Sequence, residues 1–415
     1  MKNLIIVFFL LPHVLFAQEK GIHFEHGLSW EQVKAKAKKE NKYIFMDCFT
    51  TWCGPCRFMS ANIFPLAEVG DSMNAHFVSV ALQLDTTAGD NAEVKSWYEP
   101  GHNIAEEYKV RAYPTYLFFN ANGKIVHRFV GGSDAAGFLK KAAIALDPPI
   151  QYYALLDQYK AGKKDTAFLF TVIRSAYEAR DLETAGEVAN EYLAAQTDLY
   201  TRMNLYLVKR FTRSSKDRGF DLVLNNEDKV DSVIGKGSAS KVIHDIIFRE
   251  EVMPRISVQK MAPAEDVYSP DWTAIQSAIQ TKYPARANEM ISYSKFHFYE
   301  MNRDWNNFAT AIDAYLKSYS GKVSNDQLND FAWKVFQNCD DTTFLSQALG
   351  WSKRSFAGEQ NSGNLDTYAN ILYKLGKKEE AIQWEEKALD LSADVNKKMT
   401  QETLDKMKKG EKTWD

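Results

Sequence analysis

The chain changes its pattern at Pro148 and Pro149, and this change limits what each part can fold into. Before the diproline, short apolar runs alternate with amphipathic stretches, the order expected of a sheet flanked by helices. From about residue 150 onward strand signals nearly vanish and helical periodicity dominates. The 415 residues, 45% hydrophobic and 25% charged, suit two or three globular domains. We therefore predict an α/β domain followed by an all-α region.

The first part of the chain contains the signals of a small sheet. Four runs predict strands: residues 43–49, 77–85, 110–119 and 124–130. Asn122 and Gly123 predict a tight hairpin turn between the last two runs. Helices are predicted to begin after Ser29, after Cys53, at Asn103 and at Asp134. The stretch from 86 to 102 is polar and predicts no regular element.

Two thiols, Cys53 and Cys56, follow the first predicted strand and open a predicted helix. At a helix N-terminus, unpaired backbone N–H groups and the helix dipole stabilise a thiolate. The second thiol, one turn away, is close enough to attack a mixed disulfide formed by the first. The pair therefore predicts a dithiol that exchanges two electrons with another protein.

Metal and haem chemistry fit the cysteines less well than redox chemistry. A structural zinc site needs four ligands, usually as two close pairs. The other cysteines, Cys48 and Cys339, form no second close pair, and Arg57 stands where c-type haem attachment needs histidine. We favour a redox pair over zinc and over an inert disulfide, and expect no metal or separate cofactor. Cys48 and Cys339 are predicted to be buried and inert rather than regulatory.

The N-terminus predicts export. Lys2 precedes an apolar run of about 13 residues, shorter than the ~20 needed to span a bilayer, and Ala17 ends it. We predict a signal peptide over residues 1–17, rather than a retained anchor, and a mature protein in the periplasm. The formal net charge of −3 argues against nucleic acid or anionic membranes as partners.

Residues 28–146 resemble the thioredoxin family, in order and in detail. Three segments carry the resemblance: Met46–Cys56 with Gly54 and Pro55 between the cysteines, Tyr113–Thr115, and Gly131. They match the family's active-site segment, its cis-proline segment and the glycine that closes its last strand. The context is most similar to exported, thioredoxin-like proteins of bacterial envelopes. The resemblance implies a central mixed sheet flanked by helices, with a thioredoxin-like domain over residues 18–147.

The resemblance also implies chemical roles. Cys53 would be the attacking thiolate and Cys56 the resolving thiol. Asp47 would be the family's buried carboxylate, whose pKa burial raises, and would take the proton of Cys56. A hydrogen-bonded residue near the strand end is the alternative for Asp47. The family's lysine near this acid is not evident, because the matching strand carries Ala81, Leu82 and Gln83 instead.

The remaining site residues would contact substrate. A cis Pro114 would present the backbone of Tyr113 to an extended peptide, with a trans turn as the alternative. Trp52 would cover the thiols, with core packing as its alternative. Gly54 and Pro55, between the cysteines, complete the predicted substrate surface.

The helical part of the chain carries fewer recognisable motifs. Residues 148–325 predict helices without a recognisable motif, and residues 396–415 predict a polar tail. Residues 326–395 resemble tetratricopeptide hairpins, since Ala332 and Ala369 recur at a helix-pair period. Repeats of this kind bind peptides or serve structure.

Together these features predict an exported thiol-disulfide oxidoreductase. It would reduce protein disulfides, receive electrons from a membrane donor and select protein partners through its helical region. The alternatives are a scaffold with a redox-inactive or redox-sensing thioredoxin domain, and a disulfide oxidase or isomerase.

Overall fold

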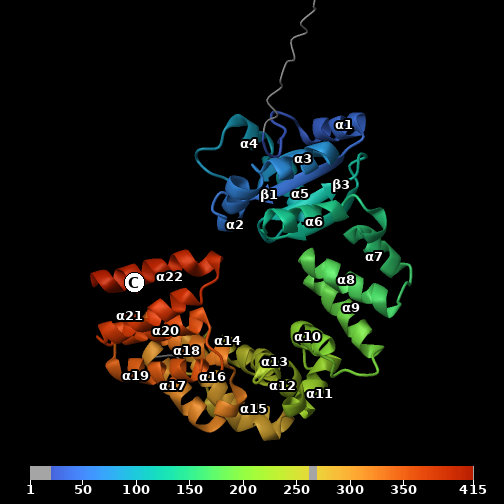
Figure 1. The fold of residues 1–415 in the computed structure, drawn as a ribbon. Coiled ribbons are helices and arrows are strands. Elements are labelled where there is room, and N and C mark those ends of the chain that lie inside the picture. The colour runs from blue at the N-terminus through green and yellow to red at the C-terminus, as the bar shows by residue number, and fades with distance from the viewer. Residues whose placement is uncertain (1–19, 261–268, 415) are drawn as a thin grey trace, which may run out of the picture. The chain divides into compact units, whose positions relative to one another are not determined.

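The computed structural model describes residues 20–260 and 269–414 (Figure 1). The predicted signal peptide, residues 1–17, therefore lies outside the described residues. Contacts group the chain into two compact units, Met1–Tyr192 and Leu193–Asp415. The helices directly after the diproline belong to the same unit as the sheet, so the predicted domain boundary at 147 stays a prediction.

The first unit is built on a four-stranded mixed sheet with strand order β2-β1-β3-β4. The strands are β1 (Tyr43–Phe49), β2 (Phe77–Gln83), β3 (Thr115–Phe119) and β4 (Ile125–Val130). β1 pairs parallel with β2 and antiparallel with β3, which pairs antiparallel with β4. The predicted fold class is confirmed. β3 begins at Thr115 rather than at 110, directly after Pro114, which has no N–H to donate to a ladder.

Alternate residues of β1 face opposite sides of the sheet, and helices cover both sides. Ile44 packs with Val33 and Ile104, which come from α1 (Trp30–Glu40) and α5 (Tyr98–Glu107). Phe45 packs on the other side with Met73 and Phe138, which come from α3 (Ala67–His76) and α6 (Ala135–Ile144). The strand is thus buried on both faces, as its continuous apolar run predicts.

The stretch from 86 to 102 is more regular than its sequence predicts. It forms α4 (Ala92–Ser96) and the first half of α5, which begins before the predicted start at Asn103. The Asn91 side chain caps α4 by accepting from the Val94 N–H. Pro100 lies in the first turn of α5, where its missing N–H breaks no helical hydrogen bond. A proline at that place therefore hides the helix from a sequence reading.

Three helices follow the sheet: α7 (Tyr152–Lys160) and α8 (Thr166–Glu178) lie within the first unit, and α9 (Leu182–Ala194) ends just beyond its boundary. α7 packs against β4, and the Tyr152 N–H donates to Nδ1 of the buried His127 over 3.2 Å. This contact ties the helical extension to the edge of the sheet.

The second unit is helical throughout its described residues. Its helices are α10 (Arg202–Phe211), α11 (Arg218–Asn225), α12 (Glu227–Ile234), α13 (Ser238–Ile247), α14 (Met253–Lys260), α15 (Trp272–Lys282), α16 (Ala287–Met301), α17 (Trp305–Tyr319), α18 (Asn325–Asn338), α19 (Thr342–Ser355), α20 (Ser362–Lys374), α21 (Lys378–Asp390) and α22 (Asp394–Lys409). α18 pairs with α19 and α20 with α21, while their membership of the tetratricopeptide class stays a prediction. None of the helices in residues 20–260 and 269–414 has the length and hydropathy to cross a membrane.

The predicted polar tail is mostly helix α22, which the sequence reading did not foresee. Leu404 and Met407, three residues apart, are buried on its inner face, and α22 packs against α21. Two apolar positions in a lysine-rich stretch give too weak a periodicity to predict a helix.

Candidate redox site

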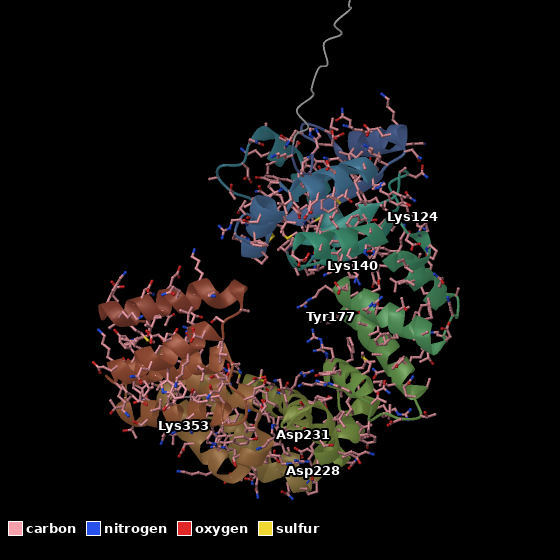
Figure 2. All side chains as sticks on the ribbon, viewed as in Figure 1. Lys124, Lys140, Tyr177, Asp228, Asp231 and Lys353 are labelled. Carbon is pink, nitrogen blue, oxygen red and sulfur yellow. A yellow bond between two sulfur atoms is a disulfide. The ribbon has the colours of Figure 1, made fainter. Side chains whose placement is uncertain are left out.

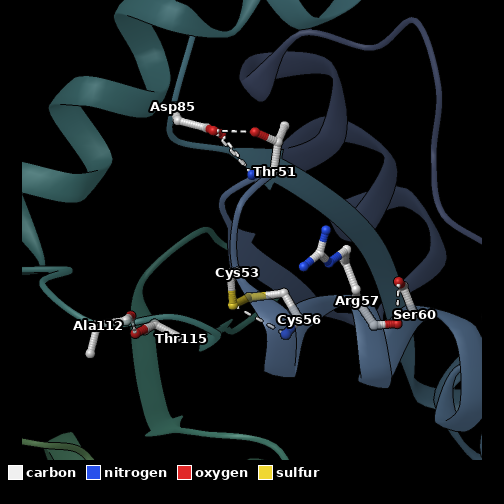
Figure 3. The surroundings of a disulfide bond; sticks show 8 residues. All are labelled: Thr51, Cys53, Cys56, Arg57, Ser60, Asp85, Ala112 and Thr115. Atoms are coloured by element: carbon white, nitrogen blue, oxygen red, sulfur yellow. Dashed lines mark hydrogen bonds between the residues drawn. A yellow bond between two sulfur atoms is a disulfide. The ribbon is translucent and has the colours of Figure 1, made fainter. Parts of the chain in front are cut away.

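Cys53 and Cys56 form a disulfide at the start of α2 (Gly54–Phe58), as Figure 3 shows. Cys53 is the N-cap residue, and the Cys56 backbone N–H donates to its Sγ over 3.1 Å. Pro55 lies in the first turn, where a missing N–H costs no helical bond. The sequence therefore builds a helix end at which the Cys56 N–H points at the Cys53 sulfur, the kind of contact that stabilises a thiolate.

The segment from Tyr113 to Gly131 flanks the pair. The Tyr113–Pro114 bond is cis, as the sequence predicts. The Gly131 N–H donates to the Pro114 carbonyl over 2.9 Å, and Gly131 has φ of +99°, which favours glycine. The next residue, Gly132, approaches Met59 of the π-helical turn Met59–Ile63 that continues α2. Two distant parts of the sequence are thereby joined beside the thiols.

The two cysteines are shielded while one aromatic ring is not. Cys53 and Cys56 are 4% and 6% exposed, whereas Trp52 is 67% exposed. The Trp52 ring meets the ring of Tyr113 edge-on, with 5.8 Å between centroids. Trp52 is therefore a surface side chain rather than a core residue. Gly54 and Pro55 are also exposed, so the predicted substrate-contact residues include three exposed neighbours of the disulfide.

Asp47 is buried in β1 beneath the cysteines. It is 6% exposed, and burial raises the pKa of its carboxyl to about 7. Among residues 20–260 and 269–414, its Oδ1 has no hydrogen-bond partner, so the strand end does not hold this oxygen. Asp47 and Cys56 line the same cavity of about 440 Å³. The site thus brings together a resolving thiol and an acid that can hold or release a proton near neutral pH.

Ala81 lies beside the Asp47 carboxyl. The sheet register pairs it directly with Asp47, and it lines the same cavity. A methyl group there offers no charge to stabilise the carboxylate, and it leaves open space beside it. One of the residues found where the family's lysine is missing, Ala81, is therefore directly beside Asp47.

The N-terminal segment forms one wall of the cavity, which the sequence reading missed. Gly21, Ile22 and Phe24 line it, and the Ile22 N–H donates to the Phe64 carbonyl over 2.8 Å. Gly21 has φ of +101°, and a Cβ at Gly70 would fall 2.2 Å from the Gly21 carbonyl oxygen. Both glycines are needed for this close approach. Only tertiary packing reveals it.

Asp85 is a second residue that the sequence reading missed. Its carboxylate accepts from the Thr51 N–H over 3.0 Å and from the Thr51 hydroxyl (Figure 3). The contact joins the end of β2 to the loop before Cys53. A Thr and an Asp 34 residues apart give no local signal of this link.

The other two cysteines are free and buried. Burial raises the pKa of the Cys48 thiol, and it raises that of Cys339 to about 11. Cys48 lies on the face of β1 opposite Asp47, within the apolar core, as strand alternation predicts. In the described parts of the chain, no group of three or more His, Cys, Asp or Glu side chains could hold a metal.

The sequence pattern of the thioredoxin-like domain matches residues 30–143. Thioredoxin-2 of Pyricularia oryzae is 37% identical over 109 residues, 26% of this chain and 52% of that protein. Thioredoxin-1 of Drosophila melanogaster is 30% identical over 95 residues, 23% of this chain and 72% of that protein. The chain belongs to the thioredoxin family, and residues 30–143 form its thioredoxin-like domain.

Two further proteins are similar to part of the chain. The thiol:disulfide interchange protein DsbD of Pseudoalteromonas atlantica is 28% identical over 116 residues, 28% of this chain and 17% of that protein. A solution structure of a candidate disulphide-isomerase from Bacteroides thetaiotaomicron is 37% identical, covers 32% of this chain and 98% of that one, and has a TM-score of 0.26. The chain spans about half the length of two of its curated relatives, 52% of the Pyricularia oryzae thioredoxin-2 and 55% of thioredoxin Y of Oryza sativa.

Proposed function

We propose that this protein is an exported thiol-disulfide oxidoreductase that reduces protein disulfides through Cys53 and Cys56. The observation that carries the proposal is the disulfide at a helix N-terminus above a buried acid with a raised pKa, Asp47, which shares a cavity with Cys56. Membership of the thioredoxin family supports the same chemistry.

In the reduced protein, the Cys53 thiolate attacks one sulfur of a substrate disulfide, and the other substrate sulfur leaves as a thiolate. A mixed disulfide now joins Cys53 to the substrate. Cys56 loses its proton to the Asp47 carboxylate and attacks the Cys53 sulfur. The substrate leaves with two electrons gained, and the Cys53–Cys56 disulfide forms. Asp47 then returns its proton to the leaving thiolate or to water.

Three further parts of the proposal rest on the sequence. Export and a periplasmic location follow from the predicted signal peptide at residues 1–17. A reductant outside the cytoplasm needs electrons, so a membrane donor is the implied partner. The helical regions, from 148 onward, would select or position protein partners, with tetratricopeptide-like hairpins at 326–395.

Two measurements test the proposal. The reduction potential of the Cys53–Cys56 pair should lie near that of thioredoxin, about −270 mV, rather than in the oxidase and isomerase range of about −120 to −180 mV. Equilibration of the full chain in defined thiol buffers, followed by alkylation and mass readout, gives this value. A value in the upper range would reverse the direction, and the absence of a reversible couple would favour the scaffold alternative.

The second measurement is insulin reduction by cysteine variants. Cys53→Ser should abolish it, and Cys56→Ser should trap substrates as mixed disulfides on Cys53. Cys48→Ser is the matched control, because Cys48 is buried on the other face of the sheet and should leave the rate unchanged. Insulin reduction by Cys53→Ser at the normal rate would refute the proposal.

A further inference from the structure

The helical unit concentrates positive charge around one cavity. The whole chain carries a formal net charge of −3. A cavity of about 350 Å³ between α10 and α13 is nevertheless lined by five cations and a single acid, Asp245. The cations are Lys209, Arg210, Arg213, Lys241 and Arg249. Such a local excess of one charge is the electrostatic mark of an anion-binding surface.

The helical periodicity places most of these side chains on the exposed faces of α10 and α13. On α10, Leu205 and Val208 are buried, while Lys209 and Arg210 lie on the exposed face. On α13 and the turn after it, Lys241 and Arg249 are exposed, eight residues apart, while the intervening apolar side chains are buried. The two helices pack against each other, so their exposed cationic faces meet at the cavity.

The cations have few acidic partners: besides Asp245, Glu250 interacts electrostatically with Arg249. Lys241 pairs with Asp245 over 3.2 Å. Lys209 Nζ donates to the Ser238 hydroxyl over 3.1 Å, and Arg249 Nη1 donates to the Arg213 carbonyl over 2.8 Å. Within residues 193–260 and 269–414, no ion pair to a carboxylate is formed by Lys209, Arg213 or Arg249. An anion placed here would relieve their mutual repulsion.

A second cavity of about 420 Å³ lies next to the first. Its lining includes Lys209, Lys241 and Lys236, with one acid, Asp326. Because the two cavities share Lys209 and Lys241, they are neighbours, and we call them together the α10–α13 groove. Two adjacent cationic cavities suit an extended ligand with several charges better than a compact ion.

We propose that the α10–α13 groove binds an acidic segment of a partner polypeptide. Guanidinium groups donate paired hydrogen bonds to carboxylates, which suits Arg210, Arg213 and Arg249 to Asp and Glu side chains. Tyr206 on α10 lines the groove and is 43% exposed, so it offers apolar surface to the same segment. This binding needs no thiol chemistry, and it stands or falls independently of the proposed reductase function.

The test uses the full chain and a fluorescein-labelled deca-glutamate peptide, with fluorescence anisotropy as the readout. The peptide should bind at low salt and weaken steeply as salt rises. The double variant Arg213→Gln with Lys241→Gln should bind about tenfold more weakly. Arg213→Glu, a single charge reversal at an exposed side chain, gives a second reading if the double variant folds poorly.

The matched control removes two positive charges elsewhere on the same unit. Lys353, labelled in Figure 2, and Lys398 are both exposed, so Lys353→Gln with Lys398→Gln changes the net charge equally. This variant should bind the peptide as the parent does, and so should Cys53→Ser. Absence of peptide binding at low salt, or an equal loss in the control, would overturn the proposal. Tighter binding of tripolyphosphate than of the peptide would also overturn it, in favour of a small phosphate ligand.

Discussion

The sheet and the helical unit each bury an acid whose pKa is raised, but the surroundings differ. Asp47 lies in β1 beside Cys56 and an open cavity, and burial alone raises its pKa. Glu385 lies in α21, fully buried, where burial and the like charge of Asp366 on α20 both raise its pKa. The first acid has a thiol to exchange a proton with, and the second has another acid.

A shifted pKa identifies a functional group only when the neighbouring groups are considered with it. Asp47 shares its cavity with a thiol whose proton must move during the reaction. Glu385 stands between Ala381 and Ala388 on the helix face that packs against α20, where an apolar side chain would suit the core. We therefore expect Asp47 to matter for rate and stability, and Glu385 for stability alone.

Asp47→Asn should give the largest change. The unfolded carboxyl ionises near pH 4, whereas the folded one keeps its proton to about pH 7, so the protein loses stability as pH rises between these values. The variant should lack this loss and be up to about 4 kcal/mol more stable than the parent at pH 8. Denaturant unfolding at pH 5 and pH 8 checks it. The same variant should reduce insulin about tenfold more slowly.

Glu385→Gln should stabilise the protein at pH 8, by up to about 4 kcal/mol on the same reasoning, and have little effect near pH 4. The reason is the sign of the shift: a raised pKa in the folded state makes ionisation at high pH destabilising. Insulin reduction should not change. The exposed neighbour Glu386→Gln is the control and should leave stability within about 0.5 kcal/mol. A loss of reductase activity in Glu385→Gln would refute the expectation that Glu385 affects stability alone.

Ala81→Lys should make Asp47 behave like an ordinary acid. The new ammonium would enter the cavity beside the carboxylate and lower the pKa of Asp47 by about 1 to 3 units. Carbon-13 detected NMR titration of the carboxyl measures this directly. Ala81→Met fills the same space without charge and should not lower the pKa, so a similar fall in both variants would refute the electrostatic explanation.

Trp52→Ala should have the smallest effect. Because Trp52 is mostly exposed and contacts the ring of Tyr113, its removal should cost little stability, within about 1 kcal/mol. It should weaken substrate capture, seen as a few-fold rise in KM for insulin with kcat nearly unchanged. A large loss of stability would show instead that the ring is structural.

Features set by short stretches of sequence could be predicted. The alternation in β1 placed Asp47 and Cys48 on opposite faces, and the spacing of Cys53 and Cys56 predicted their disulfide. These depend on local periodicity and on a motif within one turn of helix.

Features made by distant segments could not be predicted. The cavity beside Asp47 exists because Gly21 and Gly70, 49 positions apart in number, touch through their backbones. The link from Thr51 to Asp85 and the groove between α10 and α13 likewise need helix and strand packing that no local pattern encodes. Helix α22 could not be predicted for another reason, because only two apolar residues, Leu404 and Met407, form its buried face.

Where Gly21 approaches Gly70, the first described residues of the domain line the cavity beside Asp47. A shortened protein that starts after Phe24 would keep the cysteines, the sheet and the cis proline, yet would remove four residues that line the cavity, Lys20, Gly21, Ile22 and Phe24. Water would then reach Asp47 freely and return its ionisation toward that of a surface aspartate. Anyone trimming this protein for crystals or assays should therefore begin no later than Lys20, or the proton chemistry under study will be that of a different site.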